Sequence, residues 1–194
     1  MATLTLAKAA LRTKIKNILK NISTEEKAEQ SANVFKKLCA LHEYRCSIRV
    51  SIYLSTKDEI DTMSILQHMF ETGKEVFVPQ YHGNNMEMVH LKSMEDYKTL
   101  PLTKWNIKQP NRTEYRKNAL ETGGLDLIIL PGVAFTKTGK RLGHGMGYYD
   151  KYLKRCFQNQ KTKPYLIALG FKEQIQDDVP TNENDVAVNT VLTG

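Results

Sequence analysis

The segment LDLIIL at residues 125–130, followed by RLGHGMGYYD at residues 141–150, decides the fold of this chain. The first segment is almost continuously apolar, which is typical of a strand buried on both faces of a sheet. Pro131-Gly132 ends this strand, and a glycine-rich loop follows at residues 139–147. The pattern of residues 148–157 then predicts a helix. A buried strand, a loop and a helix in this order indicate an α/β sheet.

Strands and helices also alternate on both sides of this segment. Residues 48–54 and 75–79 are predicted strands, and residues 60–71 form a predicted helix between them, which makes a βαβ unit. A turn at residues 82–85 leads into a predicted antiparallel strand at 86–91, and residues 165–170 predict one more strand. We therefore expect a single domain over residues 1–194, with a Rossmann-like, mostly parallel sheet and helices on both faces.

The remaining segments are predicted to surround this sheet. Residues 4–21 predict an amphipathic helix, and a second helix begins at Ser23, where Ser-Thr-Glu-Glu is a start signal. Residues 92–122 contain Pro101, Pro110 and many polar side chains, so we expect a long surface excursion there. The residues after Gly170 predict a polar tail.

Composition limits the classes of protein to which the chain can belong. It has 194 residues, of which 41% are hydrophobic and 25% charged, and no apolar run approaches the roughly 20 residues that span a bilayer. Its formal charge of +7 favours polyanionic partners. Three cysteines without metal-ligand spacing predict free thiols in a reducing compartment. The basic N-terminal segment superficially resembles a transit peptide, but its apolar spacing is that of a folded helix, so we expect a cytoplasmic protein.

The glycine-rich loop is the strongest candidate for a binding site. Gly143, Gly145 and Gly147 alternate directly before a helix, where backbone N–H groups and the helix N-terminus favour an anion. The loop lacks the Gly-Lys-Ser/Thr ending of a Walker loop and the spacing of a dinucleotide fingerprint. A flexible hairpin is the alternative, but Arg141 and Asp150 at its ends favour phosphate binding.

Charged residues elsewhere are open to two interpretations. Lys8, Arg12 and Lys16 share one side of the first helix, either as a functional cluster or as a solvated basic face. Glu59 lies beyond a strand end, where ligands gather in open α/β sheets, or it is a charge at the start of a helix.

The block RLGHGMGYYD resembles the signature of the 5-formyltetrahydrofolate cyclo-ligase family, and the likeness covers nearly the whole chain. Further agreement comes from SIYLSTKDEI, WNIKQP, GGLDLIILPGVAF and the NENDV segment. The resemblance implies an ATP-driven ring closure of 5-formyltetrahydrofolate to 5,10-methenyltetrahydrofolate, with release of ADP and phosphate.

The resemblance also implies residue roles. The catalytic residues are expected to be Lys8, Arg12 and Arg141, and the Mg²⁺ ligands Asp150 and Asp185. The implied ATP contacts are Lys8, Ala9, Ala10, Leu11, Arg12, Arg141, Leu142, Gly143, His144, Gly145, Met146, Gly147, Tyr148 and Tyr149. The implied folate contacts are Arg12, Leu54, Glu59, Trp105, His144, Gly145, Met146, Gly147 and Tyr148. His144, Met146 and Gln80 stand where related enzymes have other, mostly basic residues.

We therefore expect a monomeric enzyme that acts on small molecules and binds neither nucleic acid nor membrane. Two alternatives remain. The net charge and the basic helix also suit a nucleic-acid or polyanion-binding module, whose affinity would fall steeply with salt. A catalytically inactive, folate-binding relative would share the same motifs.

Overall fold

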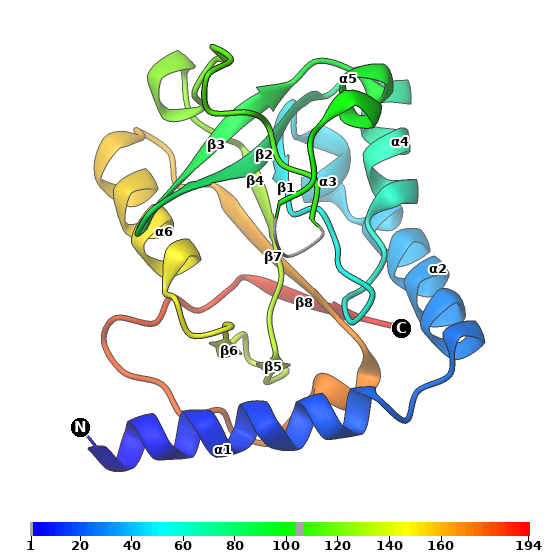
Figure 1. Cartoon of the computed structure of the whole chain (residues 1–194), viewed down its shortest axis with the longest axis vertical. Helices are drawn as coiled ribbons and strands as arrows, with labels where there is room; N and C mark the ends of the chain where they lie inside the picture. The colour runs from blue at the N-terminus through cyan, green and yellow to red at the C-terminus, as the bar shows by residue number, and fades with distance from the viewer. Residues whose placement is uncertain (1, 104–106) are drawn as a thin grey trace.

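The structure is a computed structural model that describes residues 2–103 and 107–194, and its centre is a six-stranded sheet (Figure 1). The strand order is β3-β2-β1-β4-β7-β8, and only the β2–β3 pair is antiparallel. The strands are β1 (Arg49–Ile52), β2 (Glu75–His82), β3 (Asn85–Leu91), β4 (Leu127–Leu130), β7 (Tyr165–Gly170) and β8 (Thr190–Thr193). The predicted mostly parallel α/β sheet is confirmed.

Helices cover the sheet from both sides. They are α1 (Ala2–Leu19), α2 (Thr24–Ala40), α3 (His42–Cys46), α4 (Met63–Glu71), α5 (Met94–Thr99) and α6 (Tyr148–Asn159). Figure 1 shows α6 on one side, α2 and α4 on the other, and α1 across one end of the sheet. The predicted start of α2 is confirmed, because the Ser23 hydroxyl accepts a hydrogen bond from the Glu26 backbone N–H. None of the described helices has the length and apolar character needed to cross a bilayer.

Three predictions about individual segments were wrong. The segment after Gly170 is not a polar tail throughout, because β8 pairs in parallel with β7. The helix predicted at 60–71 begins only at Met63, since side-chain hydrogen bonds between Ser55 and Thr62 close the preceding residues into a loop. The glycine-rich loop contains β6 (Arg141–Leu142), which pairs with β5 (Ala134–Phe135).

The excursion at residues 92–122 is also more ordered than predicted. It contains α5 and a 3₁₀ turn, η1 (Leu120–Thr122). The Arg116 guanidinium is buried and donates to both carboxylate oxygens of Asp96, at 2.6 and 2.7 Å. It also donates to Glu114 and to the His90 carbonyl oxygen, which lies on β3. This cluster ties the excursion to the edge of the sheet.

Two glycines position the β5–β6 hairpin at the carboxyl ends of the central strands. A Cβ on Gly132, after β4, or on Gly170, at the end of β7, would come within 2.6 or 2.7 Å of the Phe135 ring. The absence of these side chains lets the ring insert between the two strand ends. The hairpin thus lies against α1, and the loop that follows β6 opens at this edge of the sheet.

Candidate functional site

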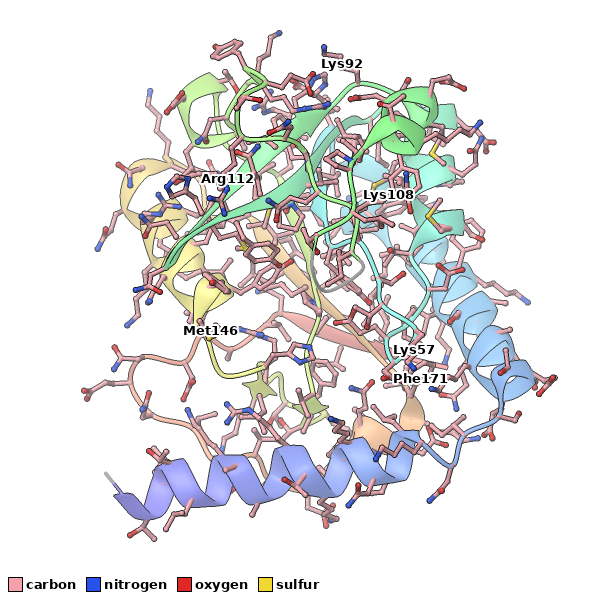
Figure 2. The ribbon with its side chains drawn as sticks, in the orientation of Figure 1. Lys57, Lys92, Lys108, Arg112, Met146 and Phe171 are labelled. Atoms are coloured by element: carbon pink, nitrogen blue, oxygen red, sulfur yellow. The ribbon has the colours of Figure 1, made fainter. Side chains whose placement is uncertain are left out.

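The glycine loop joins β6 to α6 and lies directly before the helix N-terminus. Gly145 and Gly147 have φ values of 110° and 66°, a conformation that side chains with a Cβ rarely adopt. Met146 between them is exposed on this loop, as Figure 2 shows. The backbone N–H groups at the start of α6 have no helical partner and are free to bind an anion.

Helix α1 brings Arg12 onto this loop. The Arg12 Nε donates a hydrogen bond of 2.9 Å to the Gly143 carbonyl oxygen. Its guanidinium carbon lies only 3.6 Å from where a Cβ on Gly145 would stand. The loop and the first helix, 131 residues apart in sequence, therefore form one surface.

Lys8, one helical turn before Arg12, contacts the C-terminal segment. Its Nζ lies 2.5 Å from Asp185 Oδ2, which also accepts a hydrogen bond from the Asn182 backbone N–H. Lys16, on the same side of the helix, is exposed. The three basic residues therefore do not form one solvated face, since two of them contact other segments.

Arg141 and Asp150 form an ion pair behind the loop. The Arg141 side chain is 2% exposed, and its Nη2 lies 3.1 Å from Asp150 Oδ1. Its Nη1 donates to the Pro131 carbonyl oxygen at the end of β4. Asp150 Oδ1 also accepts from the Val186 backbone N–H, at 3.0 Å. Asp150 therefore connects helix α6 to the segment that carries Asp185.

These two aspartates fit a magnesium ion that is held partly by phosphate oxygens. Asp150 Oδ2 and Asp185 Oδ1 accept no hydrogen bond from residues 2–103 or 107–194 and are available as ligands. The described residues contain no cluster of three His, Cys, Asp or Glu that could hold a metal alone. Mg²⁺ is commonly bound by one or two carboxylates together with substrate phosphates and water.

Glu59 faces the glycine loop from the segment after β1. Its Oε2 accepts hydrogen bonds from the Thr56 backbone N–H and hydroxyl, and its Oε1 lies 3.3 Å from His144 Nε2. The alternative of a helix-start charge is wrong, because α4 begins at Met63 and Asp61 accepts from the Met63 N–H. Leu54 is buried at the start of the same segment.

Tyr81, which sequence reasoning missed, forms an aromatic pair with the predicted site residue Tyr148 at the other side of the loop. The Tyr81 ring lies 4.9 Å from the Tyr148 ring, and the Tyr148 hydroxyl donates to the Gly83 carbonyl oxygen. Burial raises the pKa of Tyr81 to about 12, so this hydroxyl stays protonated at neutral pH. The predicted strand ended at residue 79, whereas β2 continues to His82 and carries Tyr81 to the site.

Gln80 does not face the glycine loop. The Gln80 amide donates to the carbonyl oxygens of Pro110 and Asn111, so it holds the excursion instead of facing the loop. Trp105 lies outside the described residues.

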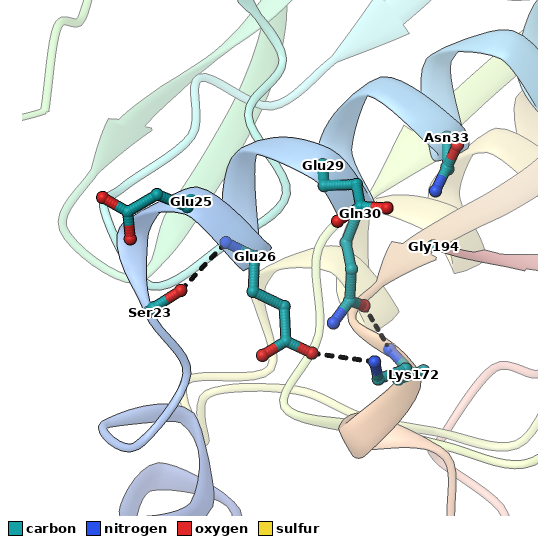
Figure 3. A pocket seen from close by; sticks show the side chains of 8 residues that line it. All are labelled: Ser23, Glu25, Glu26, Glu29, Gln30, Asn33, Lys172 and Gly194. Carbon is teal, nitrogen blue, oxygen red and sulfur yellow. Dashed lines mark hydrogen bonds and ion pairs between the residues drawn. The ribbon is translucent and has the colours of Figure 1, made fainter.

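A hollow of about 410 Å³ lies away from the glycine loop, between α2, η2 (Lys172–Gln174) and the last residue of the chain (Figure 3). In its lining, Glu26 forms an ion pair with Lys172. Gln30 is buried and fully engaged with Glu173 and the Lys172 N–H. This hollow is a seam where the C-terminus packs on α2, and it shares no residue with the loop.

Comparison with known proteins agrees with the geometry. The model of the 5-formyltetrahydrofolate cyclo-ligase family matches residues 5–194. The chain is 48% identical to the mouse 5-formyltetrahydrofolate cyclo-ligase, over 98% of this chain and 95% of the mouse protein. It is 39% identical to a probable 5-formyltetrahydrofolate cyclo-ligase of Caenorhabditis elegans, over 99% of this chain and 95% of that protein.

The fold also agrees with that of a solved structure. The solution structure of a 5,10-methenyltetrahydrofolate synthetase from Aquifex aeolicus superposes with a TM-score of 0.76 at 27% identity, covering 95% of this chain and 88% of that one. These matches confirm the resemblance that the glycine-loop motif suggested. The chain belongs to the 5-formyltetrahydrofolate cyclo-ligase family.

Proposed function

We propose that this protein converts 5-formyltetrahydrofolate to 5,10-methenyltetrahydrofolate with consumption of Mg-ATP. The observation that carries the proposal is the position of α1, which sets Arg12 on the glycine loop and Lys8 on Asp185. Two cations, a helix N-terminus and two carboxylates then surround one place, which suits a triphosphate with its metal.

The chemistry requires the formyl oxygen to become a leaving group. This oxygen attacks the γ-phosphorus of ATP and ADP departs, which leaves the former formyl carbon bonded to a phosphorylated oxygen. Nitrogen 10 of the folate then adds to that carbon and gives up its proton, and the former formyl oxygen leaves with the phosphoryl group as hydrogen phosphate. Because the reacting groups belong to the two substrates, the protein mainly positions them and balances charge.

Each charged residue has a distinct part in this proposal. Lys8 and Arg12 bind the phosphates, and the loop N–H groups hold the equatorial oxygens. Asp150 and Asp185 hold Mg²⁺, which neutralises charge on the phosphates when bound. Arg141 is a positioning residue, because its guanidinium is buried behind the loop and contacts Asp150.

Glu59 is proposed to bind the pterin edge, which presents two neighbouring N–H donors. A carboxylate accepts both donors at once. For this, Glu59 Oε1 exchanges its described partner His144 for one donor, and Oε2 exchanges the Thr56 hydroxyl for the other.

We further propose a cytoplasmic monomer with small-molecule partners. The three cysteines are free thiols, which suits a reducing compartment. The contacts of Lys8 and Arg12 with other segments of the chain argue against a basic face for nucleic acid.

The decisive experiment is incubation with 5-formyltetrahydrofolate and Mg-ATP, followed by the near-ultraviolet absorbance of the methenyl product. Arg12→Ala should lower the rate roughly 10- to 150-fold, since a charge-assisted phosphate contact contributes about 1.5–3 kcal/mol. Lys16→Ala, on the exposed part of the same helix side, is the matched control and should leave the rate unchanged.

The absence of any ATP-dependent signal in the wild-type protein would contradict the proposal. Salt-sensitive binding of nucleic acid without turnover would then favour the polyanion-binding module. Folate binding without turnover would favour the inactive relative.

A further inference from the structure

The side chain of Gln109, in the excursion, hydrogen-bonds to the main chain of Tyr81 on β2. Its Oε1 accepts from the Tyr81 N–H at 3.2 Å, and its Nε2 donates to the Tyr81 carbonyl oxygen at 3.4 Å. Arg112, labelled in Figure 2, donates to the same carbonyl oxygen from its Nε, at 3.1 Å. Among residues 2–103 and 107–194, the Gln109 side chain has no other hydrogen-bond partner. One side-chain amide therefore binds both main-chain polar groups of Tyr81.

Gln109 takes the place of a strand at this point of the sheet. The register of β1 with β2 ends at Phe77, and Tyr81 lies four residues further along β2. The other edge of β2 continues beside β3, where Tyr81 is opposite Met86. In an antiparallel pair, alternate residues direct their N–H and C=O groups away from the partner strand, where these groups need other partners. The Gln109 amide supplies one acceptor and one donor, as a neighbouring strand would.

The main chain of Tyr81 determines where its ring lies in the candidate site. The ring lies 4.9 Å from the ring of Tyr148, whose hydroxyl donates to the Gly83 carbonyl oxygen in the same hairpin. Burial raises the pKa of Tyr81 to about 12, and the charge of Glu59 contributes in the same direction. The Tyr81 side chain is therefore within electrostatic reach of the carboxylate that is proposed to bind the pterin edge.

We infer that Gln109 is a positioning residue for the folate substrate. It fixes the main chain of Tyr81, and the Tyr81 ring then forms an aromatic wall with Tyr148 for the flat pterin ring. The inference rests on the proposed function, because that function supplies the pterin. The hydrogen bonds of the Gln109 side chain involve neither α1 nor the glycine loop, so the binding of ATP should not depend on it.

The first measurement is the KM for 5-formyltetrahydrofolate and for ATP, each varied separately. Gln109→Leu keeps the approximate volume of the side chain but leaves the Tyr81 N–H without its acceptor. It should raise the KM for folate about tenfold and leave the KM for ATP unchanged. Gln109→Glu keeps the acceptor, while Arg112 still donates to the Tyr81 carbonyl oxygen. This conservative variant should stay within about threefold of the wild-type KM for folate.

Lys108→Met is the matched control, because Lys108 holds the same segment without contacting Tyr81. Lys108, also labelled in Figure 2, donates from its Nζ to three carbonyl oxygens at the end of α5, those of Tyr97, Lys98 and Leu100. The variant should lower the unfolding midpoint and leave both KM values unchanged. An equal rise of the folate KM in Lys108→Met and Gln109→Leu would assign the effect to loosening of the segment and overturn the inference.

The second measurement is amide hydrogen exchange at Tyr81 in the free protein, followed by NMR. It needs no substrate and reports directly on the N–H that Gln109 accepts. Exchange at Tyr81 should be about tenfold faster or more in Gln109→Leu, and close to the wild-type rate in Gln109→Glu and Lys108→Met. Unchanged protection of Tyr81 in Gln109→Leu would overturn the inference. Faster exchange with an unchanged KM for folate would also overturn it, because the substrate would then not depend on this contact.

The proposed function can fail separately. If the wild type binds 5-formyltetrahydrofolate but forms no methenyl product, the proposed function is contradicted, and the calorimetric Kd for folate replaces the KM. A Kd about tenfold higher in Gln109→Leu than in Lys108→Met then supports the positioning role, and equal Kd values overturn it. No folate binding to the wild type would overturn both proposals.

Discussion

At the scale of single residues, the contact between Glu59 and His144 determines how the pterin edge is bound. Oε1 of Glu59 lies 3.3 Å from His144, so a pterin donor must replace the imidazole there. His144→Ala should therefore lower the apparent KM for folate, whereas Glu59→Gln should raise it by roughly 5- to 150-fold, or about 1–3 kcal/mol. Steady-state kinetics with folate and ATP varied separately measure both effects. Equal changes in the KM for ATP would show that neither residue is specific to folate.

A second prediction at this scale concerns the two aspartates, Asp150 and Asp185. Asp150→Asn and Asp185→Asn each keep the shape of the side chain and remove the negative charge that Mg²⁺ requires. Both variants should raise the Mg²⁺ concentration that gives half-maximal rate. Asp178→Asn is the control, since its carboxylate is 73% exposed and, among the described residues, forms an ion pair only with Lys140. An unchanged Mg²⁺ titration in both test variants would make these carboxylates structural.

At the scale of elements, the Arg116 cluster controls how the excursion docks on the sheet. Hydrogen bonds from Arg116 hold the pKa of Asp96 below its ordinary value of about 3.8. The Asp96 carboxylate therefore stabilises the fold above that value, and this contribution is lost as the pH falls through the lower, folded-state pKa. Asp96→Asn should lower the free energy of unfolding by about 1–3 kcal/mol at neutral pH. It should also make that free energy depend less on pH in the acid range.

Thermal unfolding between pH 2 and 7 tests this prediction. Glu95→Gln is the matched control, because Glu95 is the neighbouring carboxylate in α5 and has no contact with Arg116. A parallel decline of both variants with acid would assign the pH dependence to other groups.

Elements differ in how well their sequence predicts them. The apolar run at residues 125–130 predicted β4, because a strand buried on both faces has a continuous apolar sequence. The Ser23 cap predicted the start of α2, because capping depends on neighbouring residues. Strand β8 has only four half-buried residues, so its place depends on β7. Helix α5 is only six residues long and is fixed by Arg116, which lies far along the chain.

At the scale of the whole molecule, the candidate site exists because distant segments meet at one edge of the sheet. The motif RLGHGMGYYD could predict the loop, since glycine spacing is a local property. The sequence alone did not place Arg12 on Gly143, because that contact joins residues 131 positions apart. Tyr81 was missed for a similar reason, as its role depends on the packing of β2 beside α6. The resemblance to a family supplied the role of Arg12, but it did not supply Tyr81.

Gly139 joins the C-terminal segment to the β5–β6 hairpin and leads to the last prediction. It has a φ of 93°, and a Cβ there would stand 2.2 Å from the Val188 carbonyl oxygen. The Val188 N–H donates to the Gly139 carbonyl oxygen, so the two backbones are in direct contact. Gly139→Ala should therefore displace the segment that carries Asp185, which lies three residues before Val188.

Gly73→Ala is a control that separates this displacement from backbone strain. Gly73 has a φ of 70°, but a Cβ there would meet nothing within 4 Å. It should cost about 1 kcal/mol in unfolding free energy and leave the Mg²⁺ dependence of the rate unchanged. Gly139→Ala should cost more than about 2 kcal/mol and also raise the Mg²⁺ concentration for half-maximal rate. Chemical denaturation and a Mg²⁺ titration of both variants measure these effects. If both variants lose the same stability and neither changes the Mg²⁺ dependence, the contact between Gly139 and Val188 does not position Asp185. Its position would then depend on Lys8 and Asn182 alone.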